Sequence, residues 1–176
     1  MNMSVPHRLK CKCPGKAALL KGWKEIYCSD IDMVKEWMSR FEGMNIGTIL
    51  GKKSGYIAVD IDLKEGEEIF NSLSGGKEYP TWSFSTPGGG RRLIYRIPDA
   101  HKDQVFNRAD FEKGPGNCTF MGQGQQTVLP PSVHNNGGTY TWIISPYDCD
   151  CAEAPDWIVE VMTTSDDPDT TYDGLD

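Results

Sequence analysis

Apolar residues in the first third of the chain recur with the period of a helix. Met33, Trp37 and Phe41 follow one another at four-residue intervals, so they share one face of a helix predicted within residues 29–43. Ser29 opens this segment as the N-cap of a capping box, and a glycine ends it. We interpret the aromatic stripe as part of the hydrophobic core.

Shorter apolar segments between turn residues predict strands. These strands cover residues 45–50, 56–62, 81–85, 91–97, 119–121, 125–129 and 139–144. Two further helices are predicted over 65–73 and 155–162. We expect 45–50 to pair with 56–62 as a hairpin, and we assign 99–117 mostly to loop because it is polar and rich in glycine, proline and charge. The predicted fold class is α+β, with a mixed or largely antiparallel sheet and few helices.

The strand over 56–62 ends in two aspartates, Asp60 and Asp62. Residues two apart on a strand face the same way, so these carboxylates are expected to stand side by side. Adjacent carboxylates repel, and a hard divalent cation such as Mg²⁺ or Mn²⁺ between them would neutralise the charge. Phosphoryl and nucleotidyl transfer use this arrangement. The alternative is an acidic, solvated turn, because the charged segment 64–68 follows directly.

A glycine turn between two predicted strands ends in two arginines. Gly88, Gly89 and Gly90 precede Arg91 and Arg92. Backbone N–H groups in a glycine turn and guanidinium groups both bind phosphates, which predicts a triphosphate site. Because strand residues alternate between faces, we expect only one of the two arginines to face the carboxylates. The alternative is a tight hairpin with solvated arginines.

Two prolines follow the predicted strand 125–129 and lead into Ser132 and His134. The prolines fix the backbone and end the strand pairing, so both side chains are expected in a set geometry. His134 would donate a hydrogen bond to a phosphate or carry a proton. The alternative is a surface histidine beside an Asn-Gly turn.

Length and charge limit the classes of partner. The chain has 176 residues, which predicts one domain over 1–164, and an acidic tail over 165–176 with almost no apolar residues that is predicted to be disordered. A net charge of -7 argues against binding nucleic acid over the whole surface, so such binding would need a local patch. No apolar run is long enough to span a membrane and the N-terminus lacks a signal-peptide core, which predicts a cytoplasmic protein.

Four of the six cysteines form two pairs with the same spacing, Cys11 with Cys13 and Cys149 with Cys151. If the two ends of the chain lie together, these four thiolates could form a tetrahedral zinc site. The one-residue gap departs from the usual two-residue spacing of zinc ligands, so the alternative is that the cysteines are small core residues.

Several short motifs along the chain are each weak signals, but their order makes them specific together. They are Pro14-Gly15-Lys16, Lys21-Gly22-Trp23, Trp37, Asn45-Ile46-Gly47, Ser54-Gly55, Val59-Asp60-Ile61-Asp62, Thr86-Pro87-Gly88-Gly89-Gly90-Arg91, residues 126–134, Tyr140-Thr141-Trp142 and Pro155-Asp156-Trp157. In this order the chain resembles the bifunctional primase-polymerase domain of phage and plasmid replication proteins, a branch of the archaeo-eukaryotic primase superfamily. The resemblance covers residues 14 to about 160.

The resemblance implies a two-part fold with a modified RNA-recognition-like sheet that binds a nucleoside triphosphate and divalent metals. Asp60 and Asp62 match the first acidic motif of the family and would be metal ligands. Where the family usually has a histidine that contacts the phosphates of the incoming nucleotide, this chain has Arg92. Arginine still binds phosphate bidentately but does not carry the proton as histidine does.

The position of the family's third carboxylate falls at Thr119. A metal site with two carboxylates holds its ions less tightly than one with three. Asp110 or Glu112, in the loop expected just upstream, would substitute if that loop folds back.

The implied function is metal-dependent nucleotidyl transfer by a DNA primase and polymerase on a single-stranded DNA template. Lys52, Lys53 and Trp82 are candidate template contacts. Family members often carry a helicase domain C-terminally, so either a separate replicative helicase is a partner or the acidic tail is the start of a truncated linker. The departures at Arg92 and Thr119 leave a second interpretation, a catalytically impaired nucleotide- or nucleic-acid-binding module of a replication complex. A third is a zinc-stabilised interaction domain.

Overall fold

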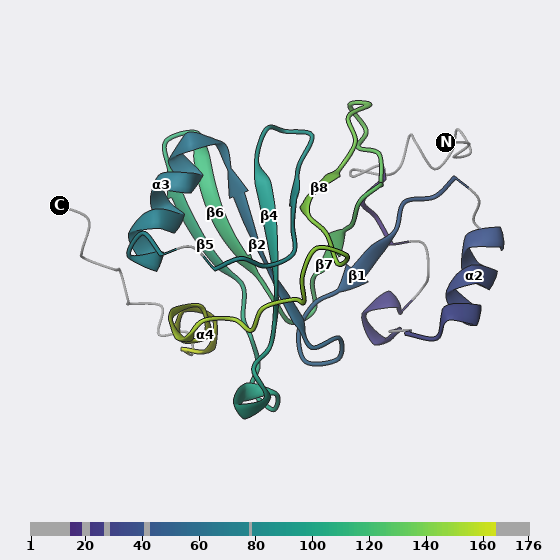
Figure 1. Ribbon diagram of the computed structural model, residues 1–176, viewed down its shortest axis with the longest axis horizontal. Coiled ribbons are helices and arrows are strands. Elements are labelled where there is room, and N and C mark those ends of the chain that lie inside the picture. Colours follow the sequence, from purple (N-terminus) through teal and green to yellow (C-terminus); the bar gives the residue numbers. More distant parts are fainter. Residues whose placement is uncertain (1–14, 19–21, 27–28, 41–42, 78, 165–176) are drawn as a thin grey trace.

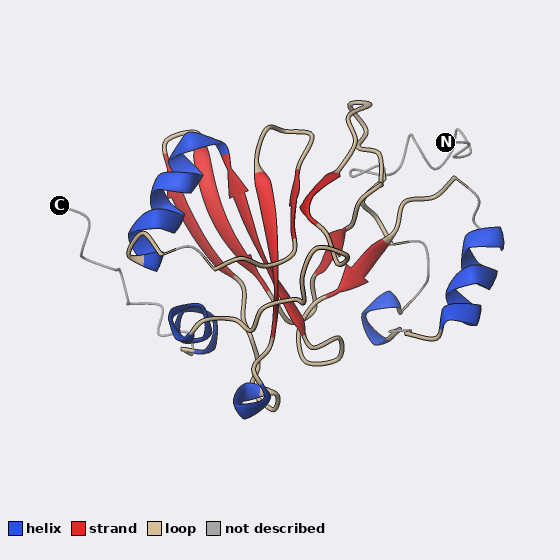
Figure 2. Cartoon of the chain, in the orientation of Figure 1, coloured by secondary structure: helices blue, strands red, loops and turns tan. Residues whose placement is uncertain are grey.

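A six-stranded antiparallel sheet dominates the computed structural model, which describes residues 15–18, 22–26, 29–40, 43–77 and 79–164 (Figures 1 and 2). The strands are β2 (Tyr56–Asp62), β3 (Ser83–Ser85), β4 (Arg91–Arg96), β5 (Ala109–Lys113), β6 (Gly116–Met121) and β8 (Thr141–Ile144). Their spatial order is β5-β6-β2-β4-β3-β8, and each neighbouring pair is antiparallel. The predicted α+β class with a largely antiparallel sheet is confirmed.

Two strands form a separate small sheet, β1 (Gly47–Ile49) and β7 (Gln126–Val128). The predicted hairpin between 45–50 and 56–62 is therefore wrong, because β1 pairs with β7 and β2 enters the large sheet. Six residues separate β1 from β2, which is long enough for the chain to change sheets. In Figure 1 the small sheet lies between the large sheet and α2 (Ile31–Arg40).

Alternation along β2 divides the molecule into two apolar layers. One face of β2 presents Ile57, Val59 and Ile61 to α3 (Leu63–Ser74) and α4 (Asp156–Thr163), and this layer is the main core. The other face presents Ala58, which packs in a smaller cluster with side chains that include Phe84, Ile94 and Val128. The two aspartates of β2 follow Ala58 on this second face. They therefore face away from α3 and α4.

The helices begin and end close to the predicted positions. Gly75 closes α3 in the left-handed conformation, with φ of 62°. The N-cap of α2 is Asp30 rather than Ser29, because Oδ1 of Asp30 accepts hydrogen bonds of 2.9 Å from the N–H groups of Asp32 and Met33. No residue of α2 is buried, so the expectation that its aromatic stripe is core is wrong, and Phe41 lies outside the described residues. None of the described helices is long and apolar enough to span a membrane.

The segment 99–117, expected to be mostly loop, contains a 3-10 turn at Asp99–His101 and the whole of β5. β5 is a short edge strand in which only Ala109 and Phe111 are apolar and alternate with Asp110 and Glu112, so its hydrophobic signal is weak. It pairs with β6 from Ala109 opposite Phe120 to Lys113 opposite Gly116. The predicted acidic tail, 165–176, lies outside the described residues.

Candidate active site

One row of side chains crosses the large sheet on the face opposite α3 and α4. In order across the strands, this row contains Asp110 on β5, Thr119 on β6, Asp60 on β2, Arg92 on β4 and Phe84 on β3. Each neighbouring pair is directly opposite in the antiparallel register, so all five side chains project from the same face. A carboxylate expected from the sequence thus lies between a hydroxyl and a guanidinium group.

Arg92 forms a bidentate ion pair with Asp60. Its Nε donates a hydrogen bond of 3.0 Å to Oδ1 of Asp60, and its Nη2 donates to Oδ2. Its Nη1 donates to Oγ1 of Thr127 on β7 at 2.8 Å, which ties the guanidinium to the small sheet. The side chains of Arg92 and Asp60 are only 11% and 19% exposed. Arg92 therefore neutralises Asp60 without a metal ion, so repulsion between the two aspartates is not by itself an argument for one.

Asp62 ends β2 two residues beyond Asp60. Burial raises the pKa of Asp62 above its ordinary value, the negative charge of Asp60 raises it further, and the charges of Arg92 and Lys16 oppose this shift. Leu63 follows with φ of 61°, a left-handed conformation that costs a non-glycine residue about 1 kcal/mol. The chain turns sharply from β2 into α3 at this point. Backbone strain of this kind is concentrated at functional sites.

The oxygen atoms at this end of the sheet fit a hard divalent cation. Asn117 on β6 lies directly opposite Asp62, and its buried side-chain oxygen has no hydrogen-bond partner within the described part of the chain. Carboxylate and amide oxygens are the ligands that such cations prefer. Among the described residues, however, no three histidine, cysteine, aspartate or glutamate side chains are grouped so as to hold an ion. The protein would supply a partial set of ligands: Asp60, Asp62 and Asn117. No pattern in the sequence singles out Asn117, since only the strand register places it here.

Thr119, at the position expected for the third carboxylate, is directly opposite Asp60 and donates a hydrogen bond of 2.8 Å to Asp110. Asp110 is also bound by Arg108 at 2.5 and 2.7 Å, and this pairing lowers the pKa of the Asp110 carboxyl. Glu112 lies on the same strand, opposite Asn117. Both acidic residues expected in a loop thus belong to β5, one strand beyond the third-carboxylate position.

The two arginines face opposite sides of the sheet, as alternation predicts. Arg91 is held by Glu67 of α3 through hydrogen bonds of 2.6 and 2.8 Å and lies against the ring of Phe70. Of this pair, Arg92 is the one that faces the carboxylates.

The glycine turn makes a close approach to the end of β2. A Cβ atom on Gly90 would overlap the carbonyl oxygen of Ile61 and lie 2.7 Å from Oδ1 of Asp62. Gly89 adopts a positive φ of 91°, while a Cβ on Gly88 would meet nothing within 4 Å. Gly90 therefore sets how closely the turn approaches Asp62.

Ser132 and His134 lie on the side of the small sheet. The Ser132 hydroxyl is hydrogen-bonded to the backbone of Ile46, accepting from its N–H at 3.0 Å and donating to its carbonyl at 3.2 Å. The half-buried ring of His134 packs edge-on against Tyr140, with ring centroids 6.3 Å apart. Burial raises the pKa of Tyr140, the charge of Arg92 opposes this shift, and the charges of Asp60 and Asp62 raise the pKa further, so Tyr140 lies within electrostatic range of the carboxylates.

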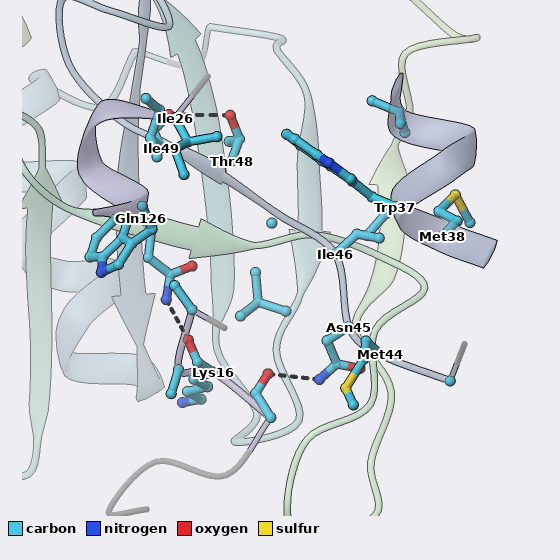
Figure 3. A pocket seen from close by; sticks show the side chains of 18 residues that line it. Lys16, Ile26, Trp37, Met38, Met44, Asn45, Ile46, Thr48, Ile49 and Gln126 are labelled. Atoms are coloured by element: carbon cyan, nitrogen blue, oxygen red, sulfur yellow. Dashed lines mark hydrogen bonds between the residues drawn. The ribbon is translucent and has the colours of Figure 1, made fainter. Parts of the chain in front are cut away.

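A cavity of about 360 Å³ lies between α2, β1 and the segment that starts at Gly15 (Figure 3). Trp37 and Met38 come from α2, and Gln126 of β7 donates a hydrogen bond of 2.6 Å to the carbonyl of Lys16. Neither aspartate of β2 lines this cavity. Lys16 connects the two regions, because it borders the cavity and its charge acts on Asp62.

The three residues predicted to contact the template make contacts within the protein. Lys52 and Lys53 form ion pairs of 3.3 and 3.1 Å with acidic residues. Trp82 stacks on Tyr56 with ring centroids 5.8 Å apart, and its indole N–H donates to a backbone carbonyl at 2.8 Å. These contacts favour a structural role for Trp82.

The zinc prediction falls partly outside the described residues, which do not include Cys11 and Cys13. Cys151 is partly buried, and its thiol donates to the carbonyl of Ile94 at 3.4 Å. Burial raises the pKa of Cys151 to about 11, which favours the neutral thiol over the thiolate that binds zinc. The shared zinc site remains a prediction.

Comparison with known proteins places the chain in one family. No curated protein matches it. The family model of the bifunctional DNA primase/polymerase N-terminal domain, Prim-Pol, matches residues 5–157. That range includes β1 to β8 and both aspartates of β2. The chain therefore belongs to the Prim-Pol family of bifunctional DNA primases and polymerases.

Proposed function

We propose that this protein is a nucleotidyltransferase that makes or extends a primer on single-stranded DNA during phage or plasmid replication. Membership of the Prim-Pol family implies DNA primase or polymerase activity. The observation that supports the proposed site is the alignment of Asp60, Arg92 and Asp62 at one end of β2 and β4, with carboxylates for a metal beside a guanidinium for phosphates.

Each residue of the site has a separate task in this proposal. Asp60, Asp62 and Asn117 would hold divalent metal, which Prim-Pol enzymes generally use and which supplies charge neutralisation at the α-phosphate and the attacking 3′-hydroxyl. Arg92 would bind the triphosphate, and Gly90 keeps the turn close enough to Asp62 for backbone N–H groups to take part. His134 would complete the pocket from the side of Tyr140.

The template would cross the cavity beside α2. Trp37 offers a ring on which a base can stack, and Lys16 offers a positive charge between the cavity and Asp62. Such a local patch allows a chain of net charge -7 to bind DNA. In this proposal the protein works in the cytoplasm of the host with a replicative helicase as partner.

A second candidate is a catalytically impaired module that binds nucleotide without efficient synthesis. Two observations favour it: the described residues contain no group of three acidic, histidine or cysteine ligands for an ion, and Asp60 is engaged by Arg92. A site with two carboxylates depends on the nucleotide and water for its remaining ligands. The two candidates predict the same binding and different turnover.

Labelled nucleotide incorporation on primed and unprimed single-stranded DNA, with Mg²⁺ or Mn²⁺, distinguishes these candidates. We expect wild-type protein to incorporate nucleotide and Asp60→Ala to lose incorporation. Asp99→Ala is the matched control, because Asp99 is an exposed acidic residue outside the site. Metal-dependent nucleotide binding without incorporation would favour the impaired module, and equal incorporation by wild type and Asp60→Ala would contradict the assigned site.

A further inference from the structure

The ion pair between Asp60 and Arg92 occupies the carboxylate that the proposed metal requires. Both oxygens of Asp60 accept hydrogen bonds from Arg92, and both side chains are largely buried. Three of the five N–H groups of Arg92 are used, two by Asp60 and one by Thr127. The guanidinium of Arg92 is thus held by side chains of two other strands, Asp60 on β2 and Thr127 on β7.

We propose that Arg92 acts as a latch that closes the metal site until a nucleotide binds. Without nucleotide, the guanidinium takes the place of the metal on Asp60. When a triphosphate enters, Arg92 exchanges its bonds to Asp60 for bonds to phosphate oxygens, and Asp60 becomes available to the metal that accompanies the nucleotide. Arg92 is then a positioning residue as well as a phosphate ligand. This inference rests on the proposed function.

Electrostatics favours this order of events. A divalent cation that approaches Asp60 alone meets the positive charge of Arg92 and loses the attraction of a carboxylate that is already neutralised. Lys16 adds a second positive charge within range of Asp62. A metal ion alone therefore finds little net negative charge at this end of the sheet.

A triphosphate changes this balance because it carries more negative charge than one carboxylate. Guanidinium groups bind phosphate oxygens bidentately, in the same geometry that Arg92 uses with Asp60. The hydrogen bond to Thr127 keeps the guanidinium of Arg92 close to Asp60 while its other bonds pass from the carboxylate to the phosphate oxygens. The triphosphate also brings the oxygen ligands that the described residues lack. Metal and nucleotide are therefore expected to bind together, each strengthening the other by the same factor.

Arg92→Gln tests the latch, with Arg96→Gln as a matched control on the same strand. Arg96 lies at the far end of β4, where its guanidinium binds Glu153 at 2.6 Å. Calorimetric titration with MnCl₂ alone is the first measurement. We expect Arg92→Gln to bind Mn²⁺ about tenfold more tightly than wild type, because the competing charge is gone. We expect Arg96→Gln to match wild type, and Arg92→Gln combined with Asp60→Asn to lose the gain.

The second measurement is the affinity for ATP and for dATP, with and without Mn²⁺. In wild type we expect Mn²⁺ to strengthen binding of the preferred nucleotide about tenfold or more. In Arg92→Gln we expect weaker nucleotide binding and a smaller effect of Mn²⁺. If Arg92→Gln does not fold, Arg92→Met replaces it, since methionine also removes the charge and fills buried space with a flexible side chain; Mn²⁺ affinity above wild type is then expected.

The outcomes separate the latch from the function on which it rests. If wild type and Arg92→Gln bind Mn²⁺ alone equally well while both bind nucleotide with Mn²⁺, the latch is wrong and the proposed function stands. If neither protein binds either nucleotide under any condition, the proposed function is wrong and the latch falls with it. Tighter Mn²⁺ binding by Arg92→Gln that depends on Asp60, together with weaker nucleotide binding, supports both.

Discussion

The hydroxyl of Thr119 donates a hydrogen bond of 2.8 Å to Oδ1 of Asp110 on the neighbouring strand. Thr119 lies directly between Asp110 and Asp60 in the row across the sheet, so the two carboxylates are separated by two strand spacings, about 10 Å. A third carboxylate is thus present on this face but displaced by one strand. Arg108 holds it there.

Replacing Thr119 by aspartate is expected to have opposite effects with and without metal. Without metal, Thr119→Asp adds a carboxylate between Asp60 and Asp110, and repulsion should lower the free energy of unfolding by about 1–2 kcal/mol. With Mn²⁺, the new ligand should tighten metal binding and raise stability. Thermal unfolding with and without Mn²⁺ measures both effects. Thr119→Asn, which adds no charge, is the control; an equal response of both variants to Mn²⁺ would show that Thr119 does not face the metal.

The two aspartates of β2 are expected to differ in their effect on stability, although we propose that both bind metal. Asp62→Asn removes a carboxylate whose ionisation is disfavoured by burial and by Asp60, so the apoprotein should be as stable as wild type or slightly more stable. Asp60→Asn leaves Arg92 without its charged partner and should cost about 1–3 kcal/mol. Urea unfolding of metal-free protein measures the difference. Metal-dependent nucleotide binding by either variant would contradict the assigned site.

The glycine turn offers a test in which two neighbouring positions should behave differently. Gly90→Ala places a Cβ against the carbonyl of Ile61 and the carboxylate of Asp62, and should lower stability by about 1–3 kcal/mol. Gly88→Ala places its Cβ in open space and should leave stability nearly unchanged. Thermal unfolding compares the two. Similar losses for both variants would mean that the turn does not pack against the end of β2 as described.

Stability is expected to fall at alkaline pH through Cys151. Its pKa is raised by burial from 9.0 to about 11, so the folded state favours the neutral thiol. The contribution of Cys151 is fully present below pH 9.0 and is lost as the pH rises towards about 11, because the unfolded state releases the proton first. Urea unfolding across this range should show a shallower loss in Cys151→Ala. An identical slope in wild type and variant would place the thiol in a more exposed setting.

Metal analysis of freshly purified, reduced protein tests the shared zinc site. If Cys11, Cys13, Cys149 and Cys151 bind one ion, about one zinc per chain is expected, and removing it with a chelator should lower the unfolding temperature. Cys118→Ala is the control: Cys118 is buried in the main core, so this variant should keep the zinc. Protein without zinc would leave the cysteines as packing residues.

Features that depend on neighbouring residues could be predicted from the sequence alone. The alternation of β2 is local, so it placed Asp60 and Asp62 on one face, and the same rule placed Arg91 and Arg92 on opposite faces. The helix that Gly75 closes follows from local composition and capping. The order of short motifs was sufficient to identify the family.

Which strands become neighbours depends on how distant segments pack together and could not be predicted from local sequence. The pairing of β1 with β7, the place of β5 at the sheet edge and the register that sets Asn117 opposite Asp62 join segments far apart in the chain. The ion pair of Arg92 with Asp60 likewise depends on the register of β2 with β4. Strand register is set by which apolar faces pack together and how loops close, and a one-residue shift would turn every side chain to the other face.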